Sequence, residues 1–204
     1  MRIIGLTGGI ASGKSIVSKT LQDLGAAAIS TDEIGHSIIE PYKPAWHDLI
    51  AYFGRQILND DLTINRQKLG AMVFNDREKL DKLNKITHPH IMAEMRSAIL
   101  AIASSNPDSV VVVEVPLLYE THMEKLFDEV WVIWVDNDTQ IKRLMARDGI
   151  EREDALKRME SQMPLDEKAK RADVLIDNRH NIEETKAIVT RNFNNILPKQ
   201  QILL

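Results

Sequence analysis

The sequence predicts an α/β fold in which five parallel strands form one sheet with helices on both faces. Nearly continuous apolar runs, the pattern of strands buried on both sides, recur at 3–6, 26–29, 110–115, 130–135 and 174–176. Segments with the 3.6-residue periodicity of helices separate these runs along the chain. Strands of this kind that alternate with helices are typical of a parallel sheet between two helical layers.

The composition restricts the class of protein. With 204 residues, the chain is long enough for one domain elaborated by inserted subdomains. A formal net charge of −4 disfavours a general nucleic-acid binder, which needs a basic face. The chain has no cysteine and no apolar segment long enough for a membrane crossing or a secretion signal. We therefore expect a cytoplasmic monomer or weak homo-oligomer without nucleic-acid or membrane partners.

The first strand leads directly into a phosphate-binding motif. Residues 8–15 read GGIASGKS and match G-x-x-x-x-G-K-[ST], the P-loop pattern. The motif lies between the strand at 3–6 and a helical pattern that begins near Lys14 and ends at Gly25. Successive backbone N–H groups of such a loop converge on phosphate oxygens at the start of a helix. The alternative, a glycine-rich turn without a ligand, is disfavoured by the position after the first strand.

We expect this P-loop nucleotide site to bind ATP together with Mg²⁺. Lys14 is predicted to contact the β- and γ-phosphates, and Ser15 is predicted to ligate Mg²⁺. The other predicted ATP contacts come from the loop and the start of the helix: Gly8, Gly9, Ala11, Ser12, Gly13 and Ile16.

Asp32 follows the second strand, which we expect to lie next to the P-loop strand. An acceptor hydroxyl could meet the γ-phosphate there, so Asp32 is the predicted general base. Its alternative role is to cap the helix that begins at Glu33, although Ser30 or Thr31 could cap that helix equally well.

A helical insertion is predicted at 34–103, where no strand-like run occurs. Prolines and a glycine punctuate its helical segments, and His88-Pro89-His90 separates a segment at 78–86 from one at 91–102. Two histidines without carboxylates at ligand spacing are more often a turn than a metal site. We therefore predict a turn there and assign no metal to it.

Glu114 ends the valine run of the third strand. A carboxylate in this position orients Mg²⁺ or its waters in P-loop enzymes, and this is the role we predict for it. The alternative is a partly solvated carboxylate at the end of a strand, without a ligand.

A charged helical stretch at 139–172 is predicted to form a mobile lid. Arg143 and Arg147 lie one helical turn apart and would clamp the transferring phosphate from one face of a helix. The alternative is a solvated face on which they pair with neighbouring acids. Arg158 and Gln162 have the same spacing and are weaker candidates of the same kind.

Other P-loop classes fit the sequence less well. GTPases read guanine with Asn-Lys-x-Asp, and the Asn84-Lys85 pair lacks the aspartate. ATPases driven by nucleic acid need a longer chain and a basic track. A small-molecule kinase therefore fits best. A kinase for another acceptor, such as a nucleoside monophosphate or a metabolite alcohol, and a non-catalytic nucleotide-binding module are the alternatives.

Taken together, these residues resemble the dephospho-coenzyme A kinase family over nearly the whole chain. The order and spacing of the shared motifs make the resemblance specific. The motifs are Ile4–Ile10 leading into the P-loop, Asp32, His88-Pro89, Val115–Glu120, Arg143–Asp148, Arg158–Gln162 and Ala172–Asn178.

The resemblance implies an ATP-dependent kinase that phosphorylates the 3′-hydroxyl of the ribose of dephospho-coenzyme A, the last step of coenzyme A synthesis. It implies that Asp32 is the catalytic aspartate and that Lys14, Arg143 and Arg147 stabilise charge on the moving phosphoryl group. It also places Asn178 near the adenine of ATP.

The resemblance further implies that the helices at 34–103 form the acceptor subdomain, with His88 and Leu117 at the acceptor pocket. The sequence departs from the usual family pattern at Ala11, where glycine is common, and at Ile16, where threonine is common. Thr31 replaces a frequent alanine. Ala11 is compatible with the loop only if its backbone angle is not restricted to glycine.

Overall fold

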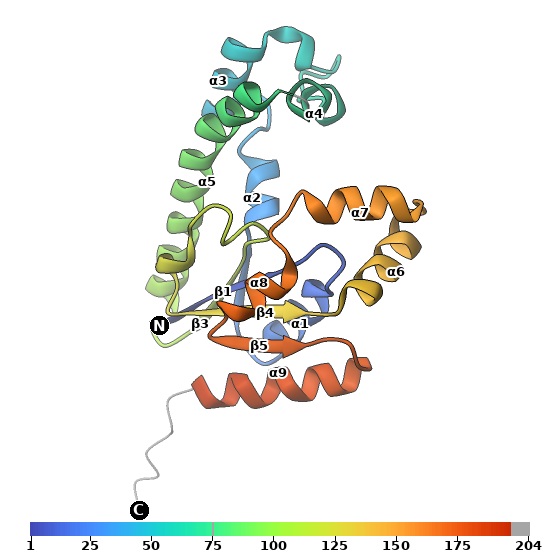
Figure 1. Ribbon diagram of the computed structural model, residues 1–204. Coiled ribbons are helices and arrows are strands. Elements are labelled where there is room, and N and C mark those ends of the chain that lie inside the picture. Colours follow the sequence, from blue (N-terminus) through green and yellow to red (C-terminus); the bar gives the residue numbers. More distant parts are fainter. Residues whose placement is uncertain (75, 197–204) are drawn as a thin grey trace, which may run out of the picture. The chain divides into compact units, whose positions relative to one another are not determined.

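The computed structural model describes residues 1–74 and 76–196, which fold as two compact units (Figure 1). The first, here called the sheet unit, comprises Met1–Ile29 and, of the described residues, 102–196. The second, here called the helical unit, comprises Ser30–Ala101. The helical unit overlaps the insertion predicted at 34–103, and a role of this unit in acceptor binding stays a prediction.

Five strands form one sheet in the order β2-β3-β1-β4-β5, so that β1 lies at its centre. The strands are β1 (Arg2–Gly8), β2 (Ala27–Ser30), β3 (Val110–Glu114), β4 (Glu129–Trp134) and β5 (Val174–Asp177). Strand β1 pairs in parallel with β3 and with β4, and β4 pairs in parallel with β5. The predicted five-stranded α/β fold is confirmed.

Both faces of the sheet are covered, which explains why its strands read as continuous apolar runs. Helices α1 (Lys14–Asp23) and α9 (Ile182–Ile196) pack together on one face. The core there comprises Ile4, Leu6, Val110, Val112, Trp131, Ile133 and Ile176 from the strands and Val17, Leu21, Val189 and Phe193 from the helices. On the other face α8 (Leu165–Lys170) packs against β4, and a Cβ on Gly5 would lie only 2.6 Å from the Phe127 ring.

One expected adjacency is wrong, because β3 lies between β1 and β2. The burial of the two strands gives the reason. The valines of β3, Val110–Val113, are at most 5% exposed, whereas in β2 only Ile29 is buried. A strand with partly exposed side chains fits the edge of a sheet, and the valine strand fits an interior position. Asp32 therefore follows an edge strand.

Helix α1 ends at Asp23, two residues before Gly25, the glycine at which the sequence predicted the end of the helical pattern. Gly25 has φ +99°, in the left-handed region that favours glycine. Its N–H donates to the Gln22 carbonyl at 2.9 Å, and the N–H of Ala26 donates to the Leu21 carbonyl at 2.9 Å. This pair of bonds satisfies carbonyls that the end of a helix would otherwise leave open.

The helical unit has a core of its own. Its helices are α2 (Thr31–Ser37), α3 (Pro44–Phe53) and α4 (Arg66–Phe74), the short helix η1 (Arg55–Ile57), and most of α5 (Arg77–Ser105). The buried cluster of this unit comprises Trp46, Leu49, Phe53, Ile57, Leu58, Ile64, Leu69 and Val73. The Trp46 indole N–H donates to the Leu62 carbonyl at 2.9 Å, so the one polar atom of this ring is satisfied.

The turn predicted at His88-Pro89-His90 is wrong, because α5 runs through these residues as one helix of 29 residues. Pro89 cannot donate the usual helical hydrogen bond, which disfavours a helix interior by about 3 kcal/mol. Packing on both sides of it compensates, since Leu83 and Ile86 lie against the core of the helical unit and Met95 is 2% exposed. No helix in the described part of the chain, α5 included, is apolar enough over a sufficient length to cross a membrane.

Three helices occupy the stretch that the sequence predicted as a lid at 139–172: α6 (Asn137–Asp148), α7 (Arg152–Glu160) and α8. Asp136 caps α6 by accepting from the Thr139 N–H at 2.9 Å, and Gly149 follows the helix with φ +64°. Ile141, Leu144 and Ala155 pack α6 against α7. The short helix η2 (Glu124–Leu126) precedes β4. The motion of a lid stays a prediction.

The packing of α1 leads to a test of the core. Leu21 is fully buried among the strands and α9, so we expect Leu21→Ala to lower the free energy of unfolding by about 2–5 kcal/mol. Ile182→Ala is the control, because Ile182 is 53% exposed and should change stability by no more than about 0.5 kcal/mol. Urea denaturation measures both, and equal losses in the two variants would contradict the assigned core.

Candidate functional site

A pocket of about 440 Å³ lies at the carboxyl ends of the central strands of the sheet unit. All the residues that line it were predicted site residues: Ala11, Ser12, Gly13, Lys14, Ser15, Glu114, Arg143 and Arg147. They come from the loop after β1, the start of α1, the end of β3 and helix α6. The fold therefore brings together residues that are more than a hundred positions apart in the sequence.

The P-loop connects β1, which ends at Gly8, to α1, which begins at Lys14. Its main chain turns on itself, since the Ser12 N–H donates to the Gly9 carbonyl at 3.2 Å. The Lys14 ammonium donates to the Gly8 and Gly9 carbonyls at 3.2 and 3.0 Å. The ammonium group therefore lies over the loop, at the start of a helix whose first N–H groups favour an anion.

Gly13 is required by a close contact with Asn178. It has φ +92°, and a Cβ at this position would lie 2.1 Å from the Asn178 Nδ2. Asn178 is 2% exposed, donates from Nδ2 to the Ser12 carbonyl at 2.7 Å and accepts from the Thr185 hydroxyl at 2.8 Å. The Asn178 side chain thus supports the P-loop main chain. Its predicted place beside adenine is a separate expectation that this geometry does not address.

Ala11, which stands where the family pattern commonly has glycine, adopts a conformation that favours glycine. Its φ is +58°, in the left-handed region where glycine is favoured. An alanine there is strained by about 1–2 kcal/mol relative to its right-handed conformation. Such strain persists only where the surrounding contacts fix the backbone.

The two arginines of α6 line the pocket but differ in their contacts. Arg143 donates to the Asn178 carbonyl at 2.9 Å, which ties α6 to the loop after β5. Arg147 donates to both carboxylate oxygens of Asp148, and Arg158 also reaches Asp148, at 2.6 Å. Hydrogen bonding between Arg147 and Asp148 raises the pKa of the guanidinium and lowers that of the carboxyl group. The pairing with an acid that the sequence left as an alternative is therefore present.

Glu114 and Ser15, the predicted magnesium ligands, both line the pocket. Glu114 is in register with Leu6, two residues before the end of β1. Within residues 1–74 and 76–196, no group of three or more histidine or acidic side chains is arranged to hold a metal ion. Mg²⁺ that is bound largely by nucleotide phosphates and water needs only one or two protein ligands. A hydroxyl and a carboxylate at one pocket fit that requirement.

Leu117 belongs to a segment that a buried ion pair holds. Lys168 of α8 is fully buried, lies 2.8 Å from the Glu120 carboxylate and donates to the Pro116 carbonyl at 2.9 Å. Glu120 also accepts from the Met163 N–H at 2.9 Å. Leu117 itself is 41% exposed. Sequence reasoning missed Lys168, whose only signal is its spacing of three from the buried Leu165.

Two glutamines contact the P-loop main chain and do not line the 440 Å³ pocket. Gln162, a weaker candidate for phosphate binding, accepts from the Ile10 N–H at 3.1 Å instead. Gln140 of α6 donates to the Ile10 carbonyl at 2.8 Å. Sequence reasoning missed Gln140. The available signal was a polar residue placed four positions before Leu144, on the buried face of α6.

Asp32 and His88 lie in the helical unit. The cap of α2 is Ser30, whose hydroxyl accepts from the Glu33 N–H at 3.2 Å, so Asp32 is not needed for that role. Asp32 is exposed in the first turn of α2. His88 lies on α5, and desolvation by nearby protein atoms lowers the pKa of its imidazole, although the residue is exposed. An imidazole with a lowered pKa is neutral at pH 7.

Comparison with known proteins gives a consistent result. The sequence model of the dephospho-CoA kinase family matches residues 2–184. A dephospho-CoA kinase from Carboxydothermus hydrogenoformans is 52% identical over 184 residues, which are 90% of this chain and 89% of that protein. A dephospho-CoA kinase from Listeria monocytogenes is 42% identical over 185 residues, 91% of this chain and 92% of that protein.

Solved structures agree in fold. The crystal structure of TT1252 from Thermus thermophilus has a TM-score of 0.82 and 28% identity, and the match covers 97% of this chain and 98% of that chain. A dephospho-CoA kinase from Campylobacter jejuni has a TM-score of 0.66 and 29% identity, with 96% and 97% covered.

The positive φ of Ala11 leads to a prediction about stability. Ala11→Gly should raise the free energy of unfolding by up to about 1 kcal/mol, because glycine adopts φ +58° without strain. Gly25→Ala provides the reverse control, since φ is +99° and nothing lies within 4 Å of a Cβ there. It should lower stability by about 1 kcal/mol through the backbone alone. Urea unfolding would refute the strain at Ala11 if the glycine variant were less stable than the natural chain.

The buried ion pair leads to a second prediction. Lys168→Met should lower the free energy of unfolding by about 3–5 kcal/mol, because it leaves the Glu120 carboxylate without its cation. Adding Glu120→Leu should recover much of that loss, since an apolar pair of similar volume tolerates burial. Lys170→Met is the control, because Lys170 pairs with Glu167 at an exposed position. A loss in the control as large as in Lys168→Met would show that burial of the pair is not the cause.

Proposed function

The chain belongs to the dephospho-CoA kinase family, and on that basis we propose that it transfers the γ-phosphoryl group of ATP to the 3′-hydroxyl of dephospho-CoA, giving CoA and ADP. The observation that carries this proposal is the pocket in which the P-loop, Glu114 and two arginines meet. The family favours dephospho-CoA over the other small acceptors that the sequence left open. It also favours a catalyst over a nucleotide-binding module without activity.

The P-loop would hold the β- and γ-phosphates with its main-chain N–H groups. Lys14 would add a positive charge, and in the structure its ammonium contacts the carbonyls of Gly8 and Gly9, the first two residues of the loop. Preorganised donors of this kind stabilise the charge that develops as the phosphoryl group moves. The predicted contacts of Gly8, Gly9, Ala11, Ser12, Gly13, Ser15 and Ile16 with ATP belong to this proposal.

Asp32 would act as general base. In the reaction, the 3′-oxygen of the acceptor bonds to the γ-phosphorus, the bond from that phosphorus to the β–γ bridging oxygen breaks, and the hydroxyl proton passes to the Asp32 carboxylate. Two observations support this role. Asp32 is exposed, and Ser30 already caps α2, so the carboxylate is not engaged in that cap.

Arg143 and Arg147 would stabilise the charge on the transferring phosphoryl group, as part of a lid at 139–172. Arg147 would have to exchange Asp148 for phosphate. Its side chain is 55% exposed, and exposed ion pairs contribute only about 0–1 kcal/mol, so this exchange costs little. Closure of the lid would exclude water that otherwise hydrolyses ATP.

Mg²⁺ would be held by Ser15 and Glu114 together with the phosphates. When bound, it would neutralise charge on the β- and γ-phosphate oxygens. The acceptor would contact Leu117 and the insertion predicted at 34–103, where neutral His88 would serve as a hydrogen-bonding group rather than as a cation. Asn178 would lie near adenine. A cytoplasmic location, a monomeric or weakly oligomeric state and the absence of nucleic-acid partners stay predictions from the sequence.

The activity is tested by incubating the purified chain with ATP, Mg²⁺ and dephospho-CoA and identifying the product by mass. We expect CoA to form in an amount equal to the ADP released. ADP release that does not depend on the acceptor, or a phosphorylated product only with another acceptor, would overturn the proposal.

The general base is tested by Asp32→Asn. The amide cannot accept the proton, so kcat should fall by about 10²–10⁴-fold while ADP affinity stays within twofold of the natural chain. Glu33→Gln, one position further along the same exposed helical turn, is the matched control and should keep its activity. A coupled ADP assay measures both, and near-normal turnover of Asp32→Asn would defeat the assignment.

A further inference from the structure

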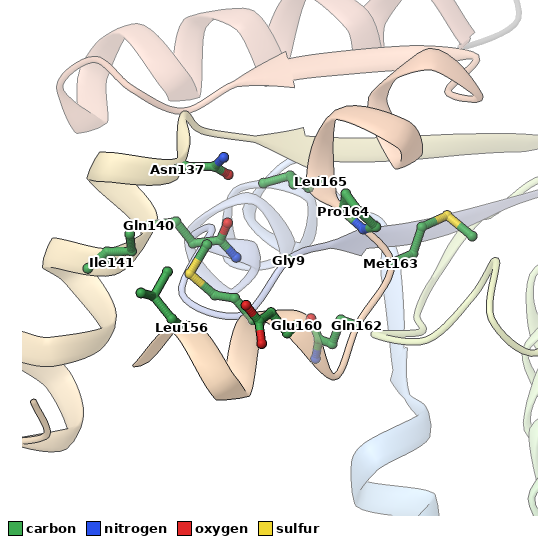
Figure 2. Close-up of a pocket in the computed structure, with 11 residues that line it drawn as sticks. Gly9, Asn137, Gln140, Ile141, Leu156, Glu160, Gln162, Met163, Pro164 and Leu165 are labelled. Carbon is green, nitrogen blue, oxygen red and sulfur yellow. The ribbon is translucent and has the colours of Figure 1, made fainter. Parts of the chain in front are cut away.

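The main chain of Ile10, near the tip of the P-loop, is bound on both sides by glutamine side chains. Gln140 Nε2 donates to the Ile10 carbonyl at 2.8 Å, and Gln162 Oε1 accepts from the Ile10 N–H at 3.1 Å. Gln140 belongs to α6, and Gln162 follows α7, so the two contacts come from separate elements. Figure 2 shows both glutamines beside Gly9, at the pocket that α6, α7 and the start of α8 enclose.

The fit around Gln140 is close. Gln140 is only 3% exposed, and a Cβ on Gly9 would lie 2.5 Å from its Nε2. Gly9 is therefore needed so that the amide can reach the next residue. A glutamine buried this deeply is stable only if its polar atoms are bonded, and the Ile10 carbonyl supplies one such partner.

The surroundings strengthen both contacts. The pocket between α6, α7 and the start of α8 has a volume of about 350 Å³. It is lined mostly by apolar side chains, among them Ile141, Leu156, Met159 and Leu165. Hydrogen bonds at such a surface compete less with water than hydrogen bonds in the open solvent do. Loss of either glutamine would leave a main-chain group of Ile10 beside an apolar wall without its partner.

The contacts on Ile10 bear directly on the strained residue that follows it. The carbonyl that Gln140 binds belongs to the peptide joining Ile10 to Ala11, and Ala11 has φ +58°. Rotation of this peptide would let Ala11 leave the left-handed region and would turn loop N–H groups away from their present directions. The glutamine contacts therefore stabilise a conformation that an alanine does not favour by itself.

We propose that Gln140 and Gln162 form a clamp on Ile10 that fixes the P-loop in the conformation that binds the polyphosphate of the nucleotide. Both are positioning residues, since neither lines the pocket where the phosphates would lie. The clamp also couples α6, which carries Arg143 and Arg147, to the loop that those arginines face. This inference rests on the proposed nucleotide site.

The test compares two ligands that differ only in the polyphosphate. ADP and adenosine are measured as competitive inhibitors against ATP for the natural chain, Gln140→Leu and Gln162→Leu. Each variant should lose on the order of tenfold in ADP affinity, as expected when a partly buried main-chain group loses its hydrogen-bond partner, and should keep adenosine affinity within twofold. The double variant should lose little more than the worse single variant, because both side chains hold one residue.

Replacement by glutamate tests the donor role of Gln140 and the acceptor role of Gln162 separately. Gln162→Glu keeps an acceptor for the Ile10 N–H, so its loss of ADP affinity should be much smaller than that of Gln162→Leu. Gln140→Glu removes the donor and faces the Ile10 carbonyl with a carboxylate, so its loss should equal or exceed that of Gln140→Leu. Glu160→Gln is the control for a change of charge, since Glu160 is exposed at the same pocket (Figure 2).

The outcomes distinguish the clamp from its alternatives. Unchanged ADP affinity in both leucine variants would overturn the clamp. Equal losses for ADP and adenosine, together with a lowered melting temperature, would show a merely structural role and would also overturn it. A full loss in Gln162→Glu would exclude the acceptor bond as the cause. Failure of the natural chain to bind ADP would instead refute the nucleotide site on which the clamp depends.

Discussion

The conformation of one short main-chain segment, residues 8–15, is the constraint on which the rest of the site depends. Phosphate is recognised in such loops by backbone N–H groups, whose directions follow from φ and ψ rather than from side chains. The loop must therefore be held from the protein side. Asn178 bonds to Ser12, while Gln140 and Gln162 bond to Ile10. All three supporting side chains come from the part of the chain after β4.

The order of the strands explains how these supports reach the loop. Because β1 is central, the loop after it lies between the ends of β3 and β4. Leu6 is in register with Glu114, and Gly8 is in register with Ile133, so the carboxyl ends of the three strands meet at one edge. The loop after β5 follows one strand further, and there Asn178 donates to Ser12. A parallel sheet thus brings residues that are distant in the sequence together at one site.

The ion pairs near the site differ in how much they cost to break. Arg143 lies against the Asn178 carbonyl, whereas Arg147 is held by Asp148, which Arg158 also contacts. The Arg147 pair is exposed and can be exchanged at little cost, but the Lys168–Glu120 pair is buried and costly to break. The first arrangement suits a group that moves to a ligand. The Lys168–Glu120 pair suits a fixed contact between α8 and the segment at 116–120.

The sequence by itself determined the class of fold, the P-loop and the family, because local patterns along the chain indicate each of them. Apolar runs showed the strands, one motif showed the phosphate loop, and Gly25 showed where α1 ends. Local patterns could not show that β3 separates β2 from β1, since they indicate where strands lie in the chain but not which strands pair. They also favoured a break at Pro89, where packing around Leu83, Ile86 and Met95 keeps α5 continuous. Only the tertiary structure placed Gln140, Gln162 and Lys168, because a polar side chain in a helix gains such a role from partners far away in the sequence.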